Sequence, residues 1–290
     1  NLEDRWIASN GKRYHEKCFK ENVAPKCNIC GKPIDGEYVH DDGGIYHREC
    51  FRREKTYKCD MCGLPIDGKY IVDFWGNRVH ETHGMSKTLF CDCCGRAISD
   101  RTSKGGVKIA DGRPICGFCK NELITKSTQI YEIKKEVEEI FRKIGIIIPE
   151  IKEITQVDKA QIKKMSGEPN NLGFAETLKM ARGKSLISIE HRIFILHSFQ
   201  RIKFAGILAH EMLHAWLNER QNNKSKKEIE GFCNLGSYLY YINCKDERAK
   251  YLIKQMEDDP NPIYGDGYRK MKKELDKYGW EELIKRMGKQ

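Results

Sequence analysis

The spacing of apolar residues becomes helical beyond residue 125 of the chain. Apolar side chains recur at three- and four-residue steps over 128–144, which predicts an amphipathic helix. Gly145 follows, and glycine at this place favours the end of a helix. Residues 172–180 and 185–198 are rich in β-branched residues, so they predict two strands of a hairpin joined around Gly183.

The next apolar stretch predicts a helix over 201–219 that carries three unexpected polar residues. Every residue between 205 and 217 is apolar except His210, Glu211 and His214. Polar groups in such a setting are costly unless they are paired or bind something. These three residues are therefore the first candidates for a functional site.

The spacing of the three residues matches an HExxH zinc motif. His210 and His214 are four residues apart, so they project from one helix face about a turn from each other and can hold one zinc ion. Glu211 stands beside them, where it can take a proton from zinc-bound water, whose pKa the metal lowers to about 7. The competing interpretation, two core histidines satisfied by neighbours, fits the apolar flanks less well.

A third protein ligand is expected from a following helix over Ser225–Tyr241, which holds Glu228 and Glu230. In the helical repeat Glu228 faces the same side as the apolar residues, which slightly favours it as the third ligand. Glu230 opens an E-G-F run that resembles the run carrying the glutamate ligand in aminopeptidases of the gluzincin class. Gly231 would let the two helices approach closely, so we expect Glu230 and keep Glu228 as the alternative. Asn234, one turn further, is placed to accept a hydrogen bond from a zinc-bound histidine.

The first 120 residues repeat one unit with a period of 32. The runs KCNICGKPIDGEYV, KCDMCGLPIDGKYI and FCDCCGRAISD begin their C-x2-C pairs at Cys27, Cys59 and Cys91. Each pair is followed by two more ligand-type residues. Such repetition indicates one metal-binding module used several times.

Each full set offers four soft or borderline ligands, which suits tetrahedral zinc and substitutes for a core that 30 residues cannot build. The sets are Cys27, Cys30, His47 and Cys50; Cys59, Cys62, His80 and His83; and Cys91, Cys94, Cys116 and Cys119. These sites have no open position, so the three zinc ions should be structural. His15 and Cys18 predict the second half of a fourth site whose first pair lies upstream. Cys93 could replace a neighbour in the third set.

Composition supports metal binding in a reducing compartment. Eleven of the 13 cysteines precede residue 120, and no secretory leader or membrane-length apolar run is visible. We therefore expect a cytoplasmic protein, with the nucleus as a second possibility, and no membrane contact. The net charge of +10 comes from Lys and Arg interleaved with Asp and Glu. No basic recognition helix with finger spacing is present, which argues against nucleic acid as a partner.

These motifs together resemble the plant LIM-domain peptidases that limit organ size and are activated by ubiquitin. The similarity includes YHRECF with KCDMC, the seven-residue gap after His83, ILAHEMLHAWL, EGFC, and DPNPIYGDGYRKMKKELDKYG. It implies an α+β fold in which tandem LIM-type zinc knuckles (1–123) precede a compact, mainly helical, gluzincin-like peptidase domain (124–290). That domain should also contain a β-hairpin or small sheet.

The resemblance also implies the chemistry and the partners. It assigns one catalytic zinc to His210, His214 and Glu230, with Glu211 as the base, and it implies limited cleavage of ubiquitin-pathway proteins. Tyr264, which the family run shares, is our candidate for a further donor to the oxyanion, although a core tyrosine would fit there equally well. Expected partners are protein substrates and ubiquitin or ubiquitinated proteins.

The leading hypothesis is a zinc-dependent endopeptidase, whose strand near 185–198 could bind substrate backbone as an added strand. We expect His191 and His197 in the hairpin to be ordinary strand residues. An alternative function, from a different class, is that of a LIM adaptor or scaffold whose peptidase domain is inactive. The intact HExxH motif and the third glutamate argue against that alternative.

Overall fold

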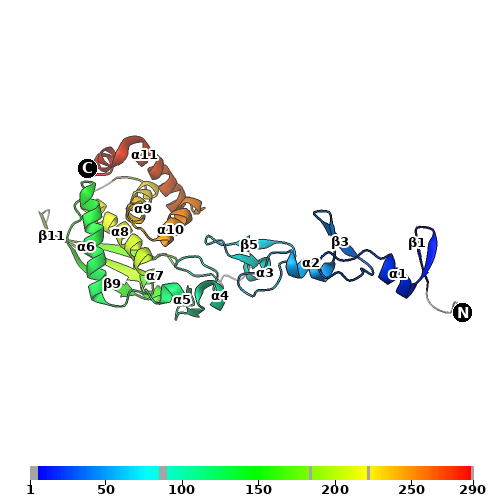
Figure 1. Cartoon of the computed structure of the whole chain (residues 1–290). Helices are drawn as coiled ribbons and strands as arrows, with labels where there is room; N and C mark the ends of the chain where they lie inside the picture. The colour runs from blue at the N-terminus through cyan, green and yellow to red at the C-terminus, as the bar shows by residue number, and fades with distance from the viewer. Residues whose placement is uncertain (1–5, 85–89, 183–184, 221–222, 289–290) are drawn as a thin grey trace. The chain divides into compact units, whose positions relative to one another are not determined.

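The computed structural model describes residues 6–84, 90–182, 185–220 and 223–288. The chain forms two compact units, Asn1–Lys87 and Thr88–Gln290, which can be followed by colour in Figure 1. Both units combine helices with small sheets, so the fold is a mixed α and β structure, as predicted at this level. Among the described residues, each helix is too short or too polar to cross a bilayer.

The first unit repeats a two-stranded antiparallel hairpin followed by a short helix. Its elements are β1 (Trp6–Ser9), β2 (Lys12–His15) and α1 (Glu16–Asn22); β3 (Tyr38–Asp41), β4 (Gly44–His47) and α2 (Arg48–Glu54); β5 (Tyr70–Val72), β6 (Arg78–His80) and α3 (Glu81–Gly84). The 32-residue repeat of the sequence is therefore a repeat of structure.

Glycine shapes the turn at each C-x2-C pair. Gly31, Gly63 and Gly95 have positive φ angles of 70°, 76° and 66°. Their N–H groups donate to the carbonyl oxygens of Cys27, Cys59 and Cys91 over 2.7–2.8 Å. Because glycine adopts this left-handed backbone without a steric cost, its recurrence every 32 residues lets each turn close around its two cysteines.

The third knuckle belongs by packing to the second unit. It contains α4 (Asp100–Ser103), β7 (Gly106–Lys108), β8 (Pro114–Cys116) and α5 (Gly117–Lys120). The Lys203 ammonium lies 3.1 Å from the Asp92 carboxylate, and the Arg113 guanidinium donates to the His197 carbonyl over 2.7 Å. We predicted a domain boundary between residues 123 and 124. The two compact units of the structure meet between Lys87 and Thr88, before this knuckle.

The remainder of the second unit contains six helices and one sheet within the described residues. They are α6 (Ser127–Lys143), β9 (Ile151–Val157), α7 (Lys159–Ser166), β10 (Gly173–Arg182), β11 (Ser185–Leu196), α8 (Arg201–Asn218), α9 (Lys226–Ile242), α10 (Glu247–Asp258) and α11 (Tyr264–Gly288). The predictions for α6, the two strands, α8 and α9 are confirmed to within a few residues. The joint predicted around Gly183 lies outside the described residues.

The sheet has three strands in the order β10, β11, β9, and β11 is its middle strand. β10 pairs antiparallel with β11, while β9 pairs parallel with residues 191–196 of β11. Our expectation that the strand near 185–198 accepts an added substrate strand was wrong for this part of β11, because both of its edges are already paired. β10 is the edge strand that faces α8.

Close helix packing sets the positions of the polar residues. α8 is buried nearly all round: it contacts β10 and β11 on one side and α9 on the other. At Gly236 of α9, an added Cβ would lie 2.9 Å from the Ala209 carbonyl oxygen of α8. At Gly231, a Cβ would lie 2.3 Å from the Gly267 carbonyl oxygen of α11. The prediction that Gly231 lets α9 approach α8 was wrong, because this glycine makes room for α11.

Candidate metal centre

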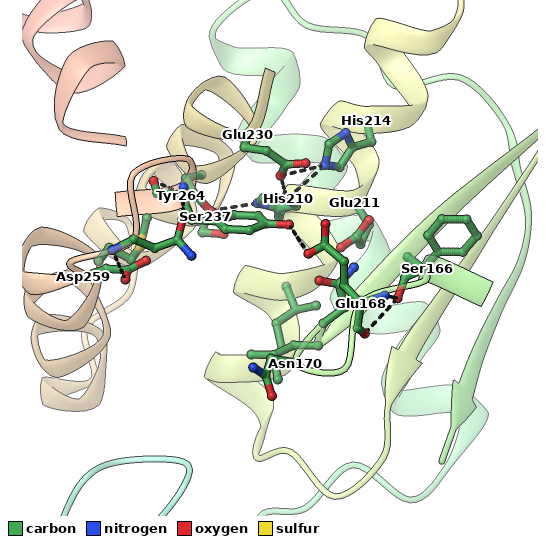
Figure 2. Close-up of a pocket in the computed structure, with 18 of the residues that line it drawn as sticks. Ser166, Glu168, Asn170, His210, Glu211, His214, Glu230, Ser237, Asp259 and Tyr264 are labelled. Carbon is green, nitrogen blue, oxygen red and sulfur yellow. Dashed lines mark hydrogen bonds and ion pairs between the residues drawn. The ribbon is translucent and has the colours of Figure 1, made fainter. Parts of the chain in front are cut away.

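Two histidines and a glutamate from neighbouring helices converge on one point. The Nε2 atoms of His210 and His214 lie 3.0 Å apart on α8. The Oε2 atom of Glu230 on α9 lies 3.3 Å from the first of these nitrogens and 3.4 Å from the second. Figure 2 shows the three side chains directed toward one another. The structure thus brings together the three ligands that we expected from sequence.

The two glutamates considered for the third position have different surroundings. Glu230 is 8% exposed; burial alone would raise its pKa, but the hydrogen bonds to His210 and His214 lower it below its ordinary value. Glu228 instead receives hydrogen bonds from Ser225 and Lys270, which lower its pKa to about 2. Glu228 completes a capping box at the start of α9, so its carboxylate is hydrogen-bonded there and does not contact the histidines.

The outer nitrogen of His210 is also held. Its Nδ1 atom lies 2.9 Å from Oδ1 of Asn234, as expected from sequence, and Nδ2 of Asn234 donates to the Tyr264 carbonyl oxygen over 3.2 Å. A proton on Nδ1 leaves the Nε2 lone pair directed toward Glu230. Asn234 therefore fixes both the tautomer and the orientation of this imidazole.

A fully buried cysteine, Cys233, lies behind His214 and was not recognised from sequence as part of the site. Its sulfur and the two histidines lie within 4.8 Å of one another, so these three residues are a second possible donor set. Burial raises the pKa of the Cys233 thiol, whereas metal binding requires a thiolate. Glu230 is already a carboxylate and faces both Nε2 atoms, so we assign it as the third donor.

Glu211 is enclosed between α8 and β10. It is 6% exposed, and burial raises its pKa, with partial compensation from His210 and His214. The nearby backbone N–H of Ala175 also lowers this pKa slightly. A Cβ at Gly173 would lie 2.5 Å from Oε1 of Glu211, so only glycine permits this approach of β10. No motif in the sequence indicated the role of Gly173.

Tyr264, the first residue of α11, directs its hydroxyl group into the same cleft (Figure 2). The hydroxyl donates to Oε2 of Glu168 over 3.1 Å. Burial raises the Tyr264 pKa, and the charges of Glu230 and Glu168 raise it further, so the phenol is protonated at neutral pH. Tyr268, one turn further along α11, is a core residue with 1% exposure.

These residues line a cleft of about 870 Å³. One wall is the segment from Ser166 to Ala175, which includes the first residues of β10. The other wall is formed by α9, the end of α10 and the start of α11. α8 provides the floor with His210, Glu211 and His214. The open side of the three-donor cluster therefore faces a space large enough for a peptide segment.

The knuckles form clusters of another kind, with four donors each. The donor atoms lie within 4.8 Å of one another in Cys27, Cys30, His47 and Cys50; in Cys59, Cys62, His80 and His83; and in Cys91, Cys94, Cys116 and Cys119. All 13 cysteines are free thiols, as metal binding requires. The three sets are those grouped from the repeat in the sequence.

The knuckle histidines show which nitrogen would bind metal. Nδ1 of His47 lies 3.4 Å from the Cys30 sulfur, while its Nε2 lies 3.0 Å from the Pro33 carbonyl oxygen. His80 repeats this arrangement with Cys62 and Pro65, at 3.5 and 3.0 Å. A proton on Nε2 thus orients each ring and presents Nδ1 to the cluster.

Other residues named from sequence are not members of these four-donor sets. His15 ends β2 and Cys18 lies exposed on α1, in the half-site predicted to need an upstream pair. The Cys93 sulfur lies 4.0 Å from the Ser198 carbonyl oxygen, between the third knuckle and the start of α8. His191 is buried, with Nδ1 2.9 Å from the Thr177 hydroxyl, and His197 contacts Ser198. Both histidines thus have ordinary structural partners.

The four-donor knuckles and the three-donor cleft define a protein with several candidate metal sites. Residues 107–245 match the family model described as "DA1-like: Protein DA1", a segment that contains all three cleft donors and Glu211. The resemblance to the plant LIM-domain family is thereby confirmed: over this segment the chain is similar to the DA1-like proteins.

Three curated plant proteins are similar to the chain. Protein DA1 of Arabidopsis thaliana is 22% identical over 61% of this chain and 44% of its own length. LIM domain-containing protein HDR3 of Oryza sativa subsp. japonica is 20% identical over 61% of this chain and 49% of its own length. Protein DA1-related 7 of Arabidopsis thaliana is 25% identical over 49% of this chain and 30% of its own length. The chain therefore spans less than half the length of these relatives.

Proposed function

We propose that the chain is a zinc-dependent endopeptidase with a gluzincin-like catalytic domain. The observation that carries this proposal is the mutual distance of 3.0–3.4 Å among Nε2 of His210, Nε2 of His214 and Oε2 of Glu230. Tetrahedral zinc with bonds of about 2.0–2.1 Å requires donor atoms about 3.3 Å apart. Two imidazoles and one carboxylate are also a donor set found in catalytic zinc sites, in which a fourth position stays open.

When bound there, zinc would polarise the substrate carbonyl group and make water more acidic. Glu211 lies beside the donors, and its raised pKa suits a group that accepts a proton from the attacking water and returns it to the leaving nitrogen. Tyr264 is protonated and directs its hydroxyl group into the cleft, where it can donate to the oxygen that gains charge.

The edge strand β10 is the element we expect to bind the substrate backbone. Its residues Gly173, Phe174 and Ala175 line the cleft next to Glu211. Among the strands that the structure describes, β11 alone pairs with β10. A peptide in extended conformation can pair with the outer edge of β10, which would hold its scissile bond above α8. This binding mode selects extended or unfolded segments, consistent with limited cleavage of proteins.

For the knuckles we propose three structural zinc ions, one in each four-donor cluster, and a role in binding or regulating protein partners. We further propose substrates among proteins of the ubiquitin pathway, ubiquitin or ubiquitinated proteins as partners, and a site of action in the cytoplasm or nucleus. The name of the rice relative, a LIM domain-containing protein, supports the assignment of the modules. The 13 free thiols support a reducing compartment.

The decisive experiment compares wild type with Glu211→Gln on unfolded casein and on ubiquitinated proteins, with zinc content measured in parallel. We expect both proteins to hold the three knuckle zinc ions and one cleft zinc ion. The variant should lose cleavage by about 10²–10⁴-fold, the usual effect of removing a general base. Glu228→Gln is the matched control, because Glu228 caps α9 away from the cluster.

The inactive adaptor is the competing function, and the same experiment separates the two. If wild type holds all four zinc ions and cuts neither substrate, the adaptor assignment replaces the peptidase. Glu230→Ala tests the donor set independently of cleavage: it should lose the cleft zinc and keep the knuckle zinc ions. Retention of all four ions in Glu230→Ala would transfer the third donor position to another residue, with Cys233 as the nearest candidate.

A further inference from the structure

Glu168 connects the two walls of the cleft. It lies in the segment between α7 and β10, on the wall that leads into the edge strand. Its Oε1 atom lies 2.6 Å from the Lys226 ammonium group, and its Oε2 atom accepts the Tyr264 hydroxyl over 3.1 Å. Lys226 is the first residue of α9 and Tyr264 is the first residue of α11. One carboxylate thus contacts the starts of both helices. Figure 2 shows its contact with Tyr264.

The backbone at Glu168 is fixed by its own side of the cleft. Gly167 ends α7 with a positive φ of 74°. The Ser166 hydroxyl accepts the Glu168 N–H over 3.1 Å and lies 2.9 Å from the Ile162 carbonyl oxygen. The helix end therefore holds Glu168 in place without help from α9 or α11. A carboxylate held in this way can orient a partner on the opposite wall.

From this arrangement we propose that Glu168 is a positioning residue that holds the Tyr264 hydroxyl group in the cleft until the substrate carbonyl oxygen takes its place. A tyrosine hydroxyl has one proton to donate, so Glu168 and the carbonyl oxygen are alternative acceptors. When Tyr264 turns to the substrate, Lys226 still neutralises Glu168, which therefore stays on its wall. This inference rests on the proposed peptidase function.

The alternative is an ordinary surface ion pair. The side chains of Lys226 and Glu168 are 54% and 39% exposed, and pairs with such exposure contribute little to folding stability. A purely structural pair would therefore leave both the melting temperature and the turnover unchanged when Glu168 is replaced. A positioning residue would leave the melting temperature nearly unchanged but lower kcat, because a hydroxyl group that is no longer oriented must be ordered during the reaction.

The test is a double-mutant cycle in the zinc-loaded full chain with fluorescein-labelled casein as substrate. We expect Tyr264→Phe to lower kcat by about 10²-fold, as the loss of one oxyanion donor does. Glu168→Ala should lower kcat by about tenfold with little change in KM. Glu168→Gln should fall between wild type and Glu168→Ala, because an amide oxygen still accepts the phenol proton. Glu168→Ala in the Tyr264→Phe background should cause no further loss.

Asp276→Asn is the control for charge alone. Asp276 lies on α11 and is not among the residues that line the cleft, and its exposed carboxylate pairs with Lys272 over 2.6 Å. The kcat of this variant should stay within about twofold of wild type, since an exposed charge outside the cleft is screened.

Several outcomes would overturn the inference. They are an unchanged kcat in Glu168→Ala, an equal loss in Asp276→Asn, a full tenfold further loss in the double variant, or wild-type kcat in Tyr264→Phe. If zinc-loaded wild type itself cuts no casein, the proposed function fails first and the inference falls with it. The two failures are thus distinguished by the wild-type rate.

Discussion

The knuckle clusters and the cleft cluster use the same ligand types for different purposes. Each knuckle surrounds one point with four donors, of which two, three or four are cysteine sulfurs, supplied by a turn, a hairpin and a short helix. The cleft brings three donors, two nitrogens and one oxygen, from two long helices. Four soft donors close a site, whereas three borderline donors leave one side accessible. The number and softness of the donors therefore separate candidate structural sites from the candidate reactive site.

A second contrast lies within the knuckles themselves. In the second knuckle Cys62 is exposed, whereas all four cysteines of the third knuckle are buried. Asp92 of the third knuckle contacts Lys203 at the start of α8, and Arg113 contacts His197 just before it, so this knuckle supports the helix that carries His210. Repeats with similar sequences have thus taken different structural roles, because one of them packs against the cleft-bearing unit.

The largest expected effect is selective loss of the cleft metal. A short exposure to 1,10-phenanthroline should abolish cleavage, by more than about 100-fold, while the knuckle zinc ions remain, since nitrogen and oxygen donors in an open site release zinc more readily than four thiol-rich donors. Activity and bound zinc are measured together during dialysis, and added zinc should restore activity. Release of all four ions at one rate would remove the distinction between closed and open sites.

Next in size is the contrast between the two kinds of knuckle. Cys116→Ser should remove the third knuckle zinc and destabilise the second unit by several kcal/mol, because metal binding energy is folding energy in such modules. Activity should fall with it. Cys62→Ser is the matched control in the other compact unit, and it should leave the unfolding transition of residues 88–290 unchanged. Calorimetry of both variants checks this, and equal shifts would contradict it.

A smaller effect is expected for the residue that orients His210. Asn234→Ala should weaken zinc binding in the cleft by about 10- to 100-fold, the usual effect of losing a residue that holds a metal-binding histidine. Competition with a fluorescent zinc chelator measures this affinity. Asn234→Asp should retain tight binding, because a carboxylate accepts the same Nδ1 proton. Unchanged affinity in Asn234→Ala would show that another group fixes the imidazole.

The smallest effect concerns Glu228, which lies on α9 near Glu230 but is not part of the three-donor cluster. Ser225 and Lys270 lower its pKa from 4.5 to about 2. Because the folded-state pKa is depressed, its contribution to stability is full above about pH 4.5 and is lost as the pH falls toward 2. Glu228→Gln should therefore cost about 1 kcal/mol at pH 7, as capping residues do. Urea unfolding of both proteins from pH 7 to pH 3 should show the difference shrinking; a constant difference would exclude this charge effect.

Comparison of Glu228 and Glu230 shows the limit of reasoning from helical periodicity. Phase along α9 favoured Glu228, yet this residue serves the N-terminal cap of the helix, and Glu230 faces the histidines. The short E-G-F run was the better guide. Gly231 within that run was interpreted correctly as a point of close packing, but its neighbour is α11 and not α8.

The sequence alone determined the features that depend on neighbours along the chain. The i, i+4 spacing of His210 and His214, the C-x2-C turns and the 32-residue repeat follow from helix and turn geometry, which a few consecutive residues set. Only the tertiary structure decided which distant segments meet. It placed Glu168 against Tyr264, 96 residues further along, and Asp92 of the third knuckle against Lys203 at the start of α8. Such contacts depend on how whole elements pack, and many arrangements satisfy the same local pattern.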